Sequence, residues 1–226
     1  VVTVNSGKVG IGTSSPTVLL DLESASPIIR LTDSDASGTP ECQVSGAGGD
    51  LIFDADRDNE KASSLMAFKV DGSERMRIDA TGAVTMPHQP AFLVKPNTEQ
   101  SNIALASNVT VLFQTEIFDQ NADFANNTFT APVAGKYQLN FSLYLKDIND
   151  AYQYIYARIQ TSNRNYEVEI YPSTIFNSDG RITVGAGFLA DMDASDTAFV
   201  TVQVPNTGSA QMDIVVYSSF SGYLVA

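Results

Sequence analysis

The sequence predicts an all-β protein in two parts, a thin β-shaft followed by a β-sandwich head. Short apolar runs separated by Gly, Pro, Asp and Ser turn signals occur along the whole chain, and no convincing amphipathic helix interrupts them. Residues 86–90 (Met-Pro-His-Gln-Pro) carry two prolines within four residues, which disfavours helix and central strand alike. We therefore place the boundary there, between residues 1–88 and residues 89–226.

The first part contains strands that are each too short and too polar to build a core within one chain. The expected strands are residues 8–11, 19–22, 28–31, 51–53, 67–70 and 76–78. A three-chain arrangement supplies the missing core, because the inward face of each chain then meets the other two. We therefore predict an intertwined trimeric β-shaft over residues 1–88, which folds only with its partner copies.

The second part shows cleaner alternation and contains all nine tyrosines. Apolar and polar residues alternate over residues 137–145, which predicts a strand with one buried face. Further strands are expected over residues 152–160, 199–204, 214–217 and 223–225. Many short strands separated by turns are typical of a sandwich or jelly roll.

Several side chains have predicted structural roles in this sandwich. Four aromatic residues are expected to fill the space between the sheets: Phe129, Tyr137, Phe141 and Phe220. Gly135 is expected to adopt a positive φ in the turn after Pro132. Gly222 is expected where a strand passes close to its neighbour.

Charge and composition exclude several partners. The formal net charge of −13 argues against nucleic acid and anionic lipid as targets, since both attract basic patches. No run of about 18 apolar residues is present, so no membrane insertion is expected. The single cysteine, Cys42, and the single histidine, His88, exclude an internal disulfide and a Cys/His zinc site within one chain. We expect Cys42 to be a small buried apolar side chain and His88 a spacer residue.

Catalytic motifs are missing from the sequence. It contains no Gly-x-Ser-x-Gly elbow, His-Glu-x-x-His motif or Walker loop, and one His with one Cys argues against nucleophilic catalysis. A carboxylate-pair glycosidase stays open, because such pairs leave no spacing signature. The acidic residues look scattered over turns, so we expect no enzyme.

Three acidic clusters alternate oxygen-bearing side chains, as a calcium site would. They begin at Asp33, Asp54 and Asp191, and none completes an EF-hand, because their twelfth positions are Val44, Leu65 and Val202 rather than Glu. Solvated turns, in which Asp bonds its own backbone, are the simpler interpretation. No cofactor is therefore expected, and if Ca²⁺ binds we expect it at Asp191 and Asp193.

Tyrosines and polar loops are the candidate binding residues. Tyrosine offers a flat apolar face plus a hydroxyl, which suits stacking on sugar rings. Binding residues often lie on loops that a rigid scaffold holds in place. We therefore expect the binding loops of this chain at the end of the sandwich opposite Pro90. The candidate receptor-binding residues are Asp147, Asn149, Asp150, Asn163, Arg164, Tyr166, Tyr171, Asn177, Asp179 and Arg181.

The second part resembles the C1q/TNF-like superfamily over about residues 90–226. FQTEIFD (113–119) with FTAPVAGKY (129–137) is similar to the family's F-x-A-P-x-x-G-x-Y signature. SFSGYL (219–224) resembles the closing strand, and DTAFV (196–200) resembles the penultimate one, although Ser195 replaces the usual glycine. Three separated signatures in the right order imply a C1q/TNF-like jelly-roll head and a homotrimer. The resemblance also implies that Tyr152, Tyr154 and Tyr156, expected on one strand face, pack at the axis of the trimer, because the family buries aromatic residues there.

The first part resembles the distal shaft of bacteriophage tail fibres. The residues that carry this resemblance are GKVGIGTSSP (7–16), DGSERMRID (71–79) and the connector MPHQPAF (86–92). The chain begins Val1-Val2-Thr3 without an initiating Met, so we expect a fragment or processed product that continues into the rest of the fibre and the virion tail. The resemblance implies a protein of the virion, extracellular at host attachment.

These observations predict a receptor-binding tip. Three heads per fibre would attach the phage, without catalysis, to a glycan or protein on the host-cell surface. Two alternatives stay open. One is a structural decoration or trimerisation module of the virion without receptor binding, and the other is a polysaccharide depolymerase.

Overall fold

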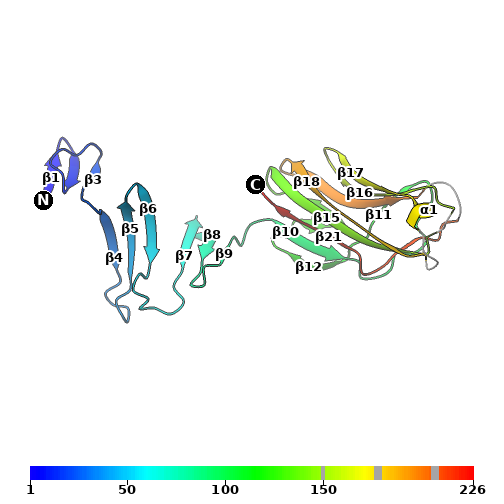
Figure 1. The fold of residues 1–226 in the computed structure, drawn as a ribbon, viewed down its shortest axis with the longest axis horizontal. Coiled ribbons are helices and arrows are strands. Elements are labelled where there is room, and N and C mark those ends of the chain that lie inside the picture. The colour runs from blue at the N-terminus through cyan, green and yellow to red at the C-terminus, as the bar shows by residue number, and fades with distance from the viewer. Residues whose placement is uncertain (149–150, 176–179, 205–208) are drawn as a thin grey trace. The chain divides into compact units, whose positions relative to one another are not determined.

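The computed structural model describes residues 1–148, 151–175, 180–204 and 209–226 (Figure 1). Contacts divide the chain into two compact units, Val1–Pro87 and His88–Ala226. Apart from the four-residue helix α1 (Pro172–Ile175), the regular elements of the described residues are β-strands. The predicted all-β class is therefore confirmed.

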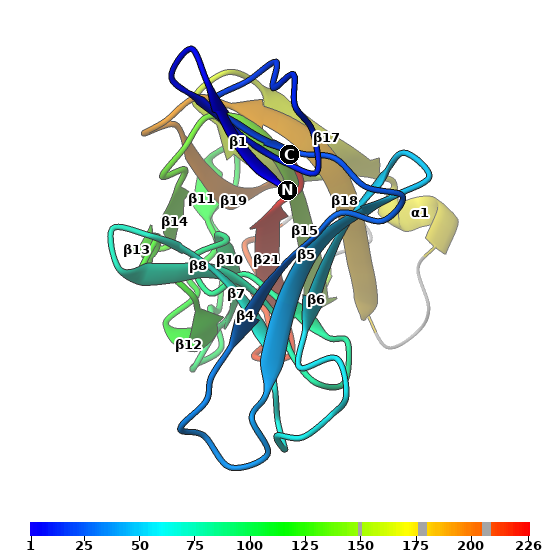
Figure 2. The same ribbon diagram turned by 90° about the vertical axis from the view of Figure 1, so that its left-hand side faces the viewer.

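Val1–Pro87 contains three separate three-stranded sheets. They are formed by β1 (Val2–Asn5), β2 (Lys8–Ile11) and β3 (Leu20–Leu22); by β4 (Ile28–Thr32), β5 (Glu41–Ala47) and β6 (Asp50–Ala55); and by β7 (Met66–Val70), β8 (Ser73–Ile78) and β9 (Val84–Thr85). Figures 1 and 2 show β4, β5 and β6 side by side. β1, β5 and β9 were not predicted from the sequence. In β5, the alternation of Cys42 and Val44 with Gln43 and Ser45 is a strand signal that could have revealed it.

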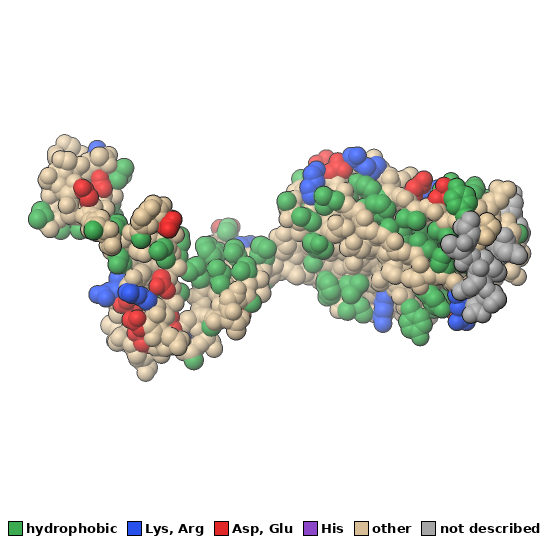
Figure 3. Space-filling model, viewed as in Figure 1, with side chains coloured by type: hydrophobic (Ala, Val, Ile, Leu, Met, Phe, Trp, Pro, Cys, Tyr) green, Lys and Arg blue, Asp and Glu red, His purple; other side chains and the backbone are tan. Residues whose placement is uncertain are grey.

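The β4–β5–β6 sheet presents an apolar face to solvent. Its register places six side chains on this face: Ile29, Leu31, Cys42, Val44, Phe53 and Ala55. Leu31 and Phe53 are 67% and 54% exposed, and Figure 3 shows hydrophobic side chains at the surface of this unit. Cys42, expected to be buried, is exposed because its sheet has a single layer here. The buried hydrophobic core of the described residues begins only at Phe92.

His88–Ala226 is a sandwich of two sheets. The first has the strand order β12-β10-β21-β15-β18, with β20 paired to β15, and the second has the order β13-β14-β19-β16-β17, with β11 paired to β19. The first sheet comprises β10 (Ala91–Lys95), β12 (Thr115–Asp119), β15 (Gly135–Lys146), β18 (Ile182–Met192), β20 (Asp213–Ile214) and β21 (Ser219–Leu224). The second comprises β11 (Asn108–Thr110), β13 (Phe124–Ala125), β14 (Thr128–Thr130), β16 (Ile155–Thr161), β17 (Asn165–Ile170) and β19 (Thr197–Gln203). The predicted jelly-roll-like sandwich is confirmed.

Aromatic rings join the two sheets. Phe92 of β10 stacks on Phe129 of β14 with ring centroids 4.7 Å apart, and on Phe124 of β13 at 5.3 Å. Phe220 of β21 packs edge-on against Phe92 at 5.0 Å. The four side chains predicted to fill the sandwich are all buried: Phe129, Tyr137, Phe141 and Phe220. Burial of these rings supplies a large apolar area at the centre of the unit.

Two glycines allow backbone and side chains to approach closely. At Gly222 an added Cβ would lie 2.6 Å from Leu139 Cδ2 and 2.8 Å from Phe92 Cε1, which confirms the predicted close approach. The predicted positive φ at Gly135 is wrong, since this residue is not in the left-handed region. Its glycine is required because a Cβ would lie 2.6 Å from the carbonyl oxygen of Ala226, where the C-terminal segment passes.

Several strands of this unit were not predicted, among them β10, β11, β13, β17 and β18, and one predicted strand ends early. β18 was not predicted, because its outward positions are Gly185, Gly187 and Leu189 rather than charged or strongly polar residues, so the period-two pattern is hidden. The strand expected over residues 214–217 ends at Ile214. The chain then turns, and the backbone N–H of Ser218 donates to the carbonyl of Val215 at 3.0 Å.

We expect Phe220→Ala to lower the free energy of unfolding of the head by about 3–5 kcal/mol, because a fully buried ring is lost. Tyrosine fluorescence in a denaturant titration measures this unit alone, since all nine tyrosines lie in it and the chain has no Trp. Tyr217→Ala is the control, because Tyr217 is 80% exposed and its loss should cost less than about 0.5 kcal/mol. Equal losses in the two variants would contradict the role of this core.

Candidate binding surfaces of the head

The head has two ends, and the chain enters at one of them. Ala91 pairs with Tyr223, and the backbone N–H of Lys136 donates to the carbonyl of Ala226 at 2.7 Å, so the start of β10 and the C-terminus lie together. At the opposite end β15 finishes at Lys146 beside β20, and α1 lies there too (Figure 1). We call these the entry end and the far end.

Part of the predicted receptor-binding set lies at the far end. Asp147 follows β15, Tyr171 follows β17, and Arg181 precedes β18. The register of β15 with β18 brings Asp147 and Arg181 together, and Tyr171 directly precedes α1 at the same end (Figure 1). The remaining predicted residues of these loops, Asn149, Asp150, Asn177 and Asp179, lie outside the described residues.

The prediction that Asn163, Arg164 and Tyr166 also lie at the far end is wrong. Asn163 and Arg164 lie in the turn between β16 and β17, and Tyr166 lies at the start of β17, all at the entry end. Asn163 Nδ2 donates to the carbonyl of Asp191 at 3.1 Å, Arg164 Nη2 donates to Asp191 Oδ2 at 2.7 Å, and Asp191 pairs with Lys136. Burial raises the pKa of Tyr166, whose ring packs against the core. Hydrophobic alternation could not reveal the error, because it gives the buried face of a strand and not its direction.

One of the two predicted calcium ligands, the Asp191 carboxylate, already has a protein partner. Asp191 is paired with Arg164, and the backbone N–H of Asp193 donates to Asp196 Oδ2 at 2.8 Å. Within the described part of the chain, no group of three or more His, Cys, Asp or Glu side chains could hold a metal ion. Calcium at Asp191 and Asp193 stays a prediction, and a cation there would have to displace Arg164. The unfolding midpoint with and without a chelator tests it.

The three tyrosines predicted at a trimer axis do not share one strand face. β16 begins at Ile155, and Tyr152 lies before it, 1% exposed, with its hydroxyl donating to the carbonyl of Ser209 at 2.7 Å. Tyr152 is therefore a core residue of its own chain and is not available to a partner. Tyr154 and Tyr156 are partly exposed on the outer face of the second sheet.

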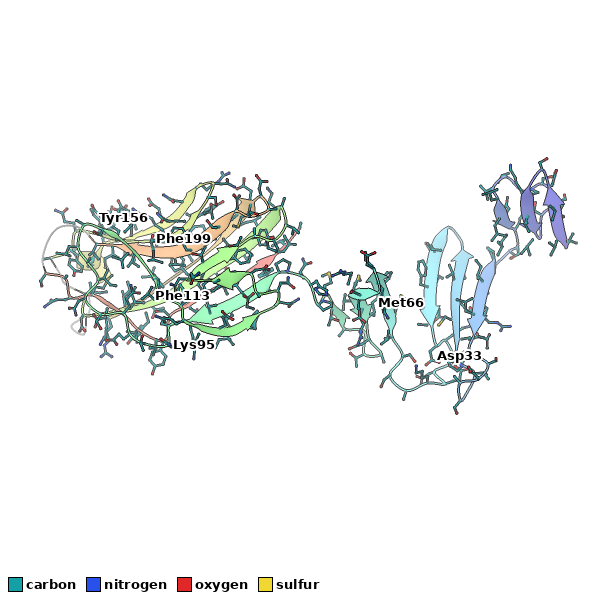
Figure 4. All side chains as sticks on the ribbon, turned by 180° about the vertical axis from the view of Figure 1, so that it is seen from behind. Asp33, Met66, Lys95, Phe113, Tyr156 and Phe199 are labelled. Atoms are coloured by element: carbon teal, nitrogen blue, oxygen red, sulfur yellow. The ribbon has the colours of Figure 1, made fainter. Side chains whose placement is uncertain are left out.

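Arg158 organises this outer face. Its Nε donates to Glu167 Oε2 at 2.7 Å, and its Nη1 donates to Gln203 Oε1 at 2.8 Å and to Asn108 Oδ1 at 2.7 Å. Its guanidinium carbon lies 4.3 Å from the centroid of the Tyr156 ring. Figure 4 labels Tyr156 and also Phe199, which belongs to the same sheet. The Arg158 side chain is only 12% exposed. One cation therefore ties together side chains from β11, β16, β17 and β19.

Beside Arg158, one carboxylate lies next to two tyrosines, and a third tyrosine packs against one of their rings. The rings of Tyr154 and Tyr156 lie 4.8 Å apart with a tilt of 49°, and Tyr156 sits directly opposite Glu169 in the sheet. The Glu169 carboxylate interacts with the hydroxyls of both Tyr156 and Tyr171. Burial, and then the Glu169 carboxylate, raises the pKa of Tyr156, whereas the hydrogen bond with Glu169 is the main reason that the pKa of Tyr171 is raised. We call Tyr154, Tyr156, Tyr171 and Glu169 the tyrosine cluster.

The outer face of the first sheet is different, because its centre is uncharged. The outward positions there are Leu93, Gln138, Asn140, Ser142, Tyr144, Thr183, Gly185, Gly187, Leu189, Ser219, Ser221 and Tyr223. Leu189 and Tyr223 are 57% and 50% exposed. Gln138 Nε2 donates to Asn140 Oδ1 at 3.0 Å, and a Cβ at Gly187 would lie 2.5 Å from that oxygen. Depletion of charge is typical of the centre of a subunit interface.

The family model of the C1q domain matches residues 91–225. The chain belongs to the C1q domain family. The resemblance predicted from the signatures at 113–137, 196–200 and 219–224 is thereby confirmed. Domains of the C1q/TNF-like type are typically non-enzymatic recognition modules and commonly form homotrimers, and no catalytic family is indicated.

Solved structures similar to the chain cover the C1q head. The globular domain of zebrafish complement 1qA protein is 22% identical, with a TM-score of 0.45, over 62% of this chain and 98% of that one. Murine APRIL at pH 8.5 is 8% identical, with a TM-score of 0.43, over 61% of this chain and 99% of that one. A search among curated proteins returns no match. In the described residues, no helix is long and apolar enough to cross a membrane.

We expect Arg158→Lys to lower the free energy of unfolding of the C1q head by about 1–2 kcal/mol, since an ammonium cannot replace the planar fork that reaches three acceptors. Arg164→Lys is the matched control, because its pair with Asp191 has the same 2.7 Å separation but its side chain is 55% exposed. The control should change by less than about 0.5 kcal/mol. Tyrosine fluorescence during urea unfolding compares the two, and equal losses would contradict the assignment.

Proposed function

We propose that the chain is part of a homotrimeric phage tail fibre whose C1q head attaches the virion, without catalysis, to a glycan on the host-cell surface. The observation that carries the proposal is that each unit exposes a sheet face suited to contact with further copies of the chain. Assembly through those faces presents three recognition heads together. The family supports the recognition role, because its domains are typically non-enzymatic recognition modules.

The uncharged face of the first sheet is the proposed contact between heads. With a net charge of −13 per chain, copies repel one another unless they meet through a neutral surface. Leu189 and Tyr223 supply exposed apolar area on this face. Gly185 and Gly187 have no side chains, so the surface between them does not protrude. This proposal moves the interface from Tyr154 and Tyr156, which lie on the other sheet, to the first sheet.

The shaft supports the same assembly. The apolar face of the β4–β5–β6 sheet leaves Leu31 and Phe53 more than half exposed in a single chain. Burying such surface contributes roughly 25 cal/mol per Å². Three copies that turn these faces toward one another would bury the surface that one chain leaves in water, which is the intertwined shaft that the sequence predicts.

We expect the chain to be a trimer in solution, with three times the 24.2 kDa mass of one chain by analytical ultracentrifugation. Leu189→Asp should raise the protein concentration at which the trimer dissociates by at least about tenfold, because it buries a charge in each copy. Val133→Asp is the control, since Val133 is 47% exposed but lies in the loop before β15. A monomeric parent protein would remove the proposal.

We expect the purified trimer to bind host cells and to leave surface polysaccharide at its original length. Each site is weak, so a variant that cannot form trimers should lose far more cell binding than Arg181→Ala at the far end. Cell binding is measured by flow cytometry with labelled protein, and polysaccharide length by size-exclusion chromatography. Shortened chains would indicate a depolymerase, and an intact trimer that binds no host strain would indicate a structural decoration.

A further inference from the structure

The tyrosine cluster has the chemistry of a sugar-binding platform. Tyr171 is 50% exposed, Tyr154 is partly exposed, and Glu169, near the end of β17, is exposed. An aromatic ring packs against the apolar C–H face of a pyranose, and a neighbouring carboxylate accepts hydrogen bonds from its hydroxyls. A carboxylate has about four acceptor positions, so Glu169 keeps acceptor capacity beyond its two tyrosine hydroxyls.

The cluster is held in place before any ligand arrives. Tyr156 and Glu169 face each other on paired strands, and Arg158 anchors the Tyr156 ring through contacts with three strands besides its own. Thr201, which lies on the same outer face opposite Arg158, is 1% exposed, and its Oγ1 has no partner among the described residues. The side chains around Arg158 therefore cover this part of the sheet and exclude water from it. Sites built on strands and fixed by neighbouring contacts lose little conformational freedom on binding.

The charges favour a neutral ligand over a cation. The cation–π position on Tyr156 is already taken by the Arg158 guanidinium at 4.3 Å. A ligand ammonium would have to sit beside that fixed positive charge. An anionic ligand would meet Glu167 and Glu169, which outnumber the single arginine. A neutral polyhydroxylated ring meets neither obstacle.

We propose that Tyr154, Tyr171 and Glu169 bind one neutral pyranose ring of a cell-surface glycan on the outer face of the second sheet. The ring rests its C–H face on the tyrosines and donates hydroxyl hydrogens to Glu169. This site lies on the sheet opposite the proposed interface, so assembly leaves it open. Its biological role rests on the proposed attachment function, but sugar binding itself is measurable without cells.

Saturation-transfer NMR on the intact chain tests the site with a defined panel, the methyl pyranosides of glucose, galactose, mannose, N-acetylglucosamine and rhamnose. Irradiating the protein's aromatic protons should transfer saturation to the C–H protons of at least one sugar. We expect Tyr171→Ala and Glu169→Gln each to weaken its binding about tenfold, which corresponds to roughly 1.4 kcal/mol. Tyr217→Ala removes an 80% exposed tyrosine that lies outside the cluster and should leave the binding unchanged.

Three outcomes would overturn the inference. No sugar of the panel receives saturation, or Tyr217→Ala weakens binding as much as Tyr171→Ala, or choline binds at the cluster in place of the sugars. Glu169→Gln keeps the rings and the shape, so a loss in this variant cannot come from a collapsed fold. The two proposals fail separately. Sugar binding that persists when no host cell binds the trimer removes only the attachment function, whereas cell binding that survives Tyr171→Ala and Glu169→Gln removes this site from attachment.

Discussion

An apolar face of a β-sheet must be covered by a second layer, and this constraint separates the two units of the chain. In the head the cover is internal, because Phe92 and Phe220 of the first sheet meet Phe124 and Phe129 of the second. In residues 1–87 the β4–β5–β6 sheet has the same kind of apolar face but leaves it in water. The head therefore has its core within one chain. We propose that the first unit gains its cover from further copies of the chain, so that assembly and folding are coupled.

Once the interior of the sandwich is filled, its two outer faces are free to differ. The first sheet carries Gly, Ser, Asn and Gln at its centre, and the second carries Arg158 with its acceptors and the tyrosine cluster. A neutral surface without protruding side chains suits contact with an identical acidic chain, whereas a rigid aromatic surface with a carboxylate suits a small polar ligand. The different roles that we propose for the two outer faces therefore follow from their side chains, since both faces belong to the same sandwich.

Alternation in the sequence predicted the strands whose two faces differ in polarity, such as Gly135–Lys146, and the aromatic residues between the sheets. It missed β18, whose outer positions are glycine and leucine. It also misplaced Asn163 and Arg164, because the end at which a turn lies depends on strand order, which no local pattern contains. The tyrosine cluster was invisible for the same reason. Tyr154 and Tyr171 are neighbours only because the β16–β17 hairpin turns at the entry end and sets Tyr156 opposite Glu169.

If the tyrosine cluster binds sugars as proposed, its placement limits which ligands can engage several copies at once. If three copies bury their first-sheet faces against one another, the three clusters face outward on separate sides of the trimer. One short ligand then cannot bridge them, and each shallow site binds alone with low affinity. Only a surface that repeats the same sugar densely, or a long polymer that can pass around the head, engages several sites at once and gains the effective concentration that attachment requires. A repeating surface polysaccharide meets this condition, and a scarce protein receptor with a single glycan does not.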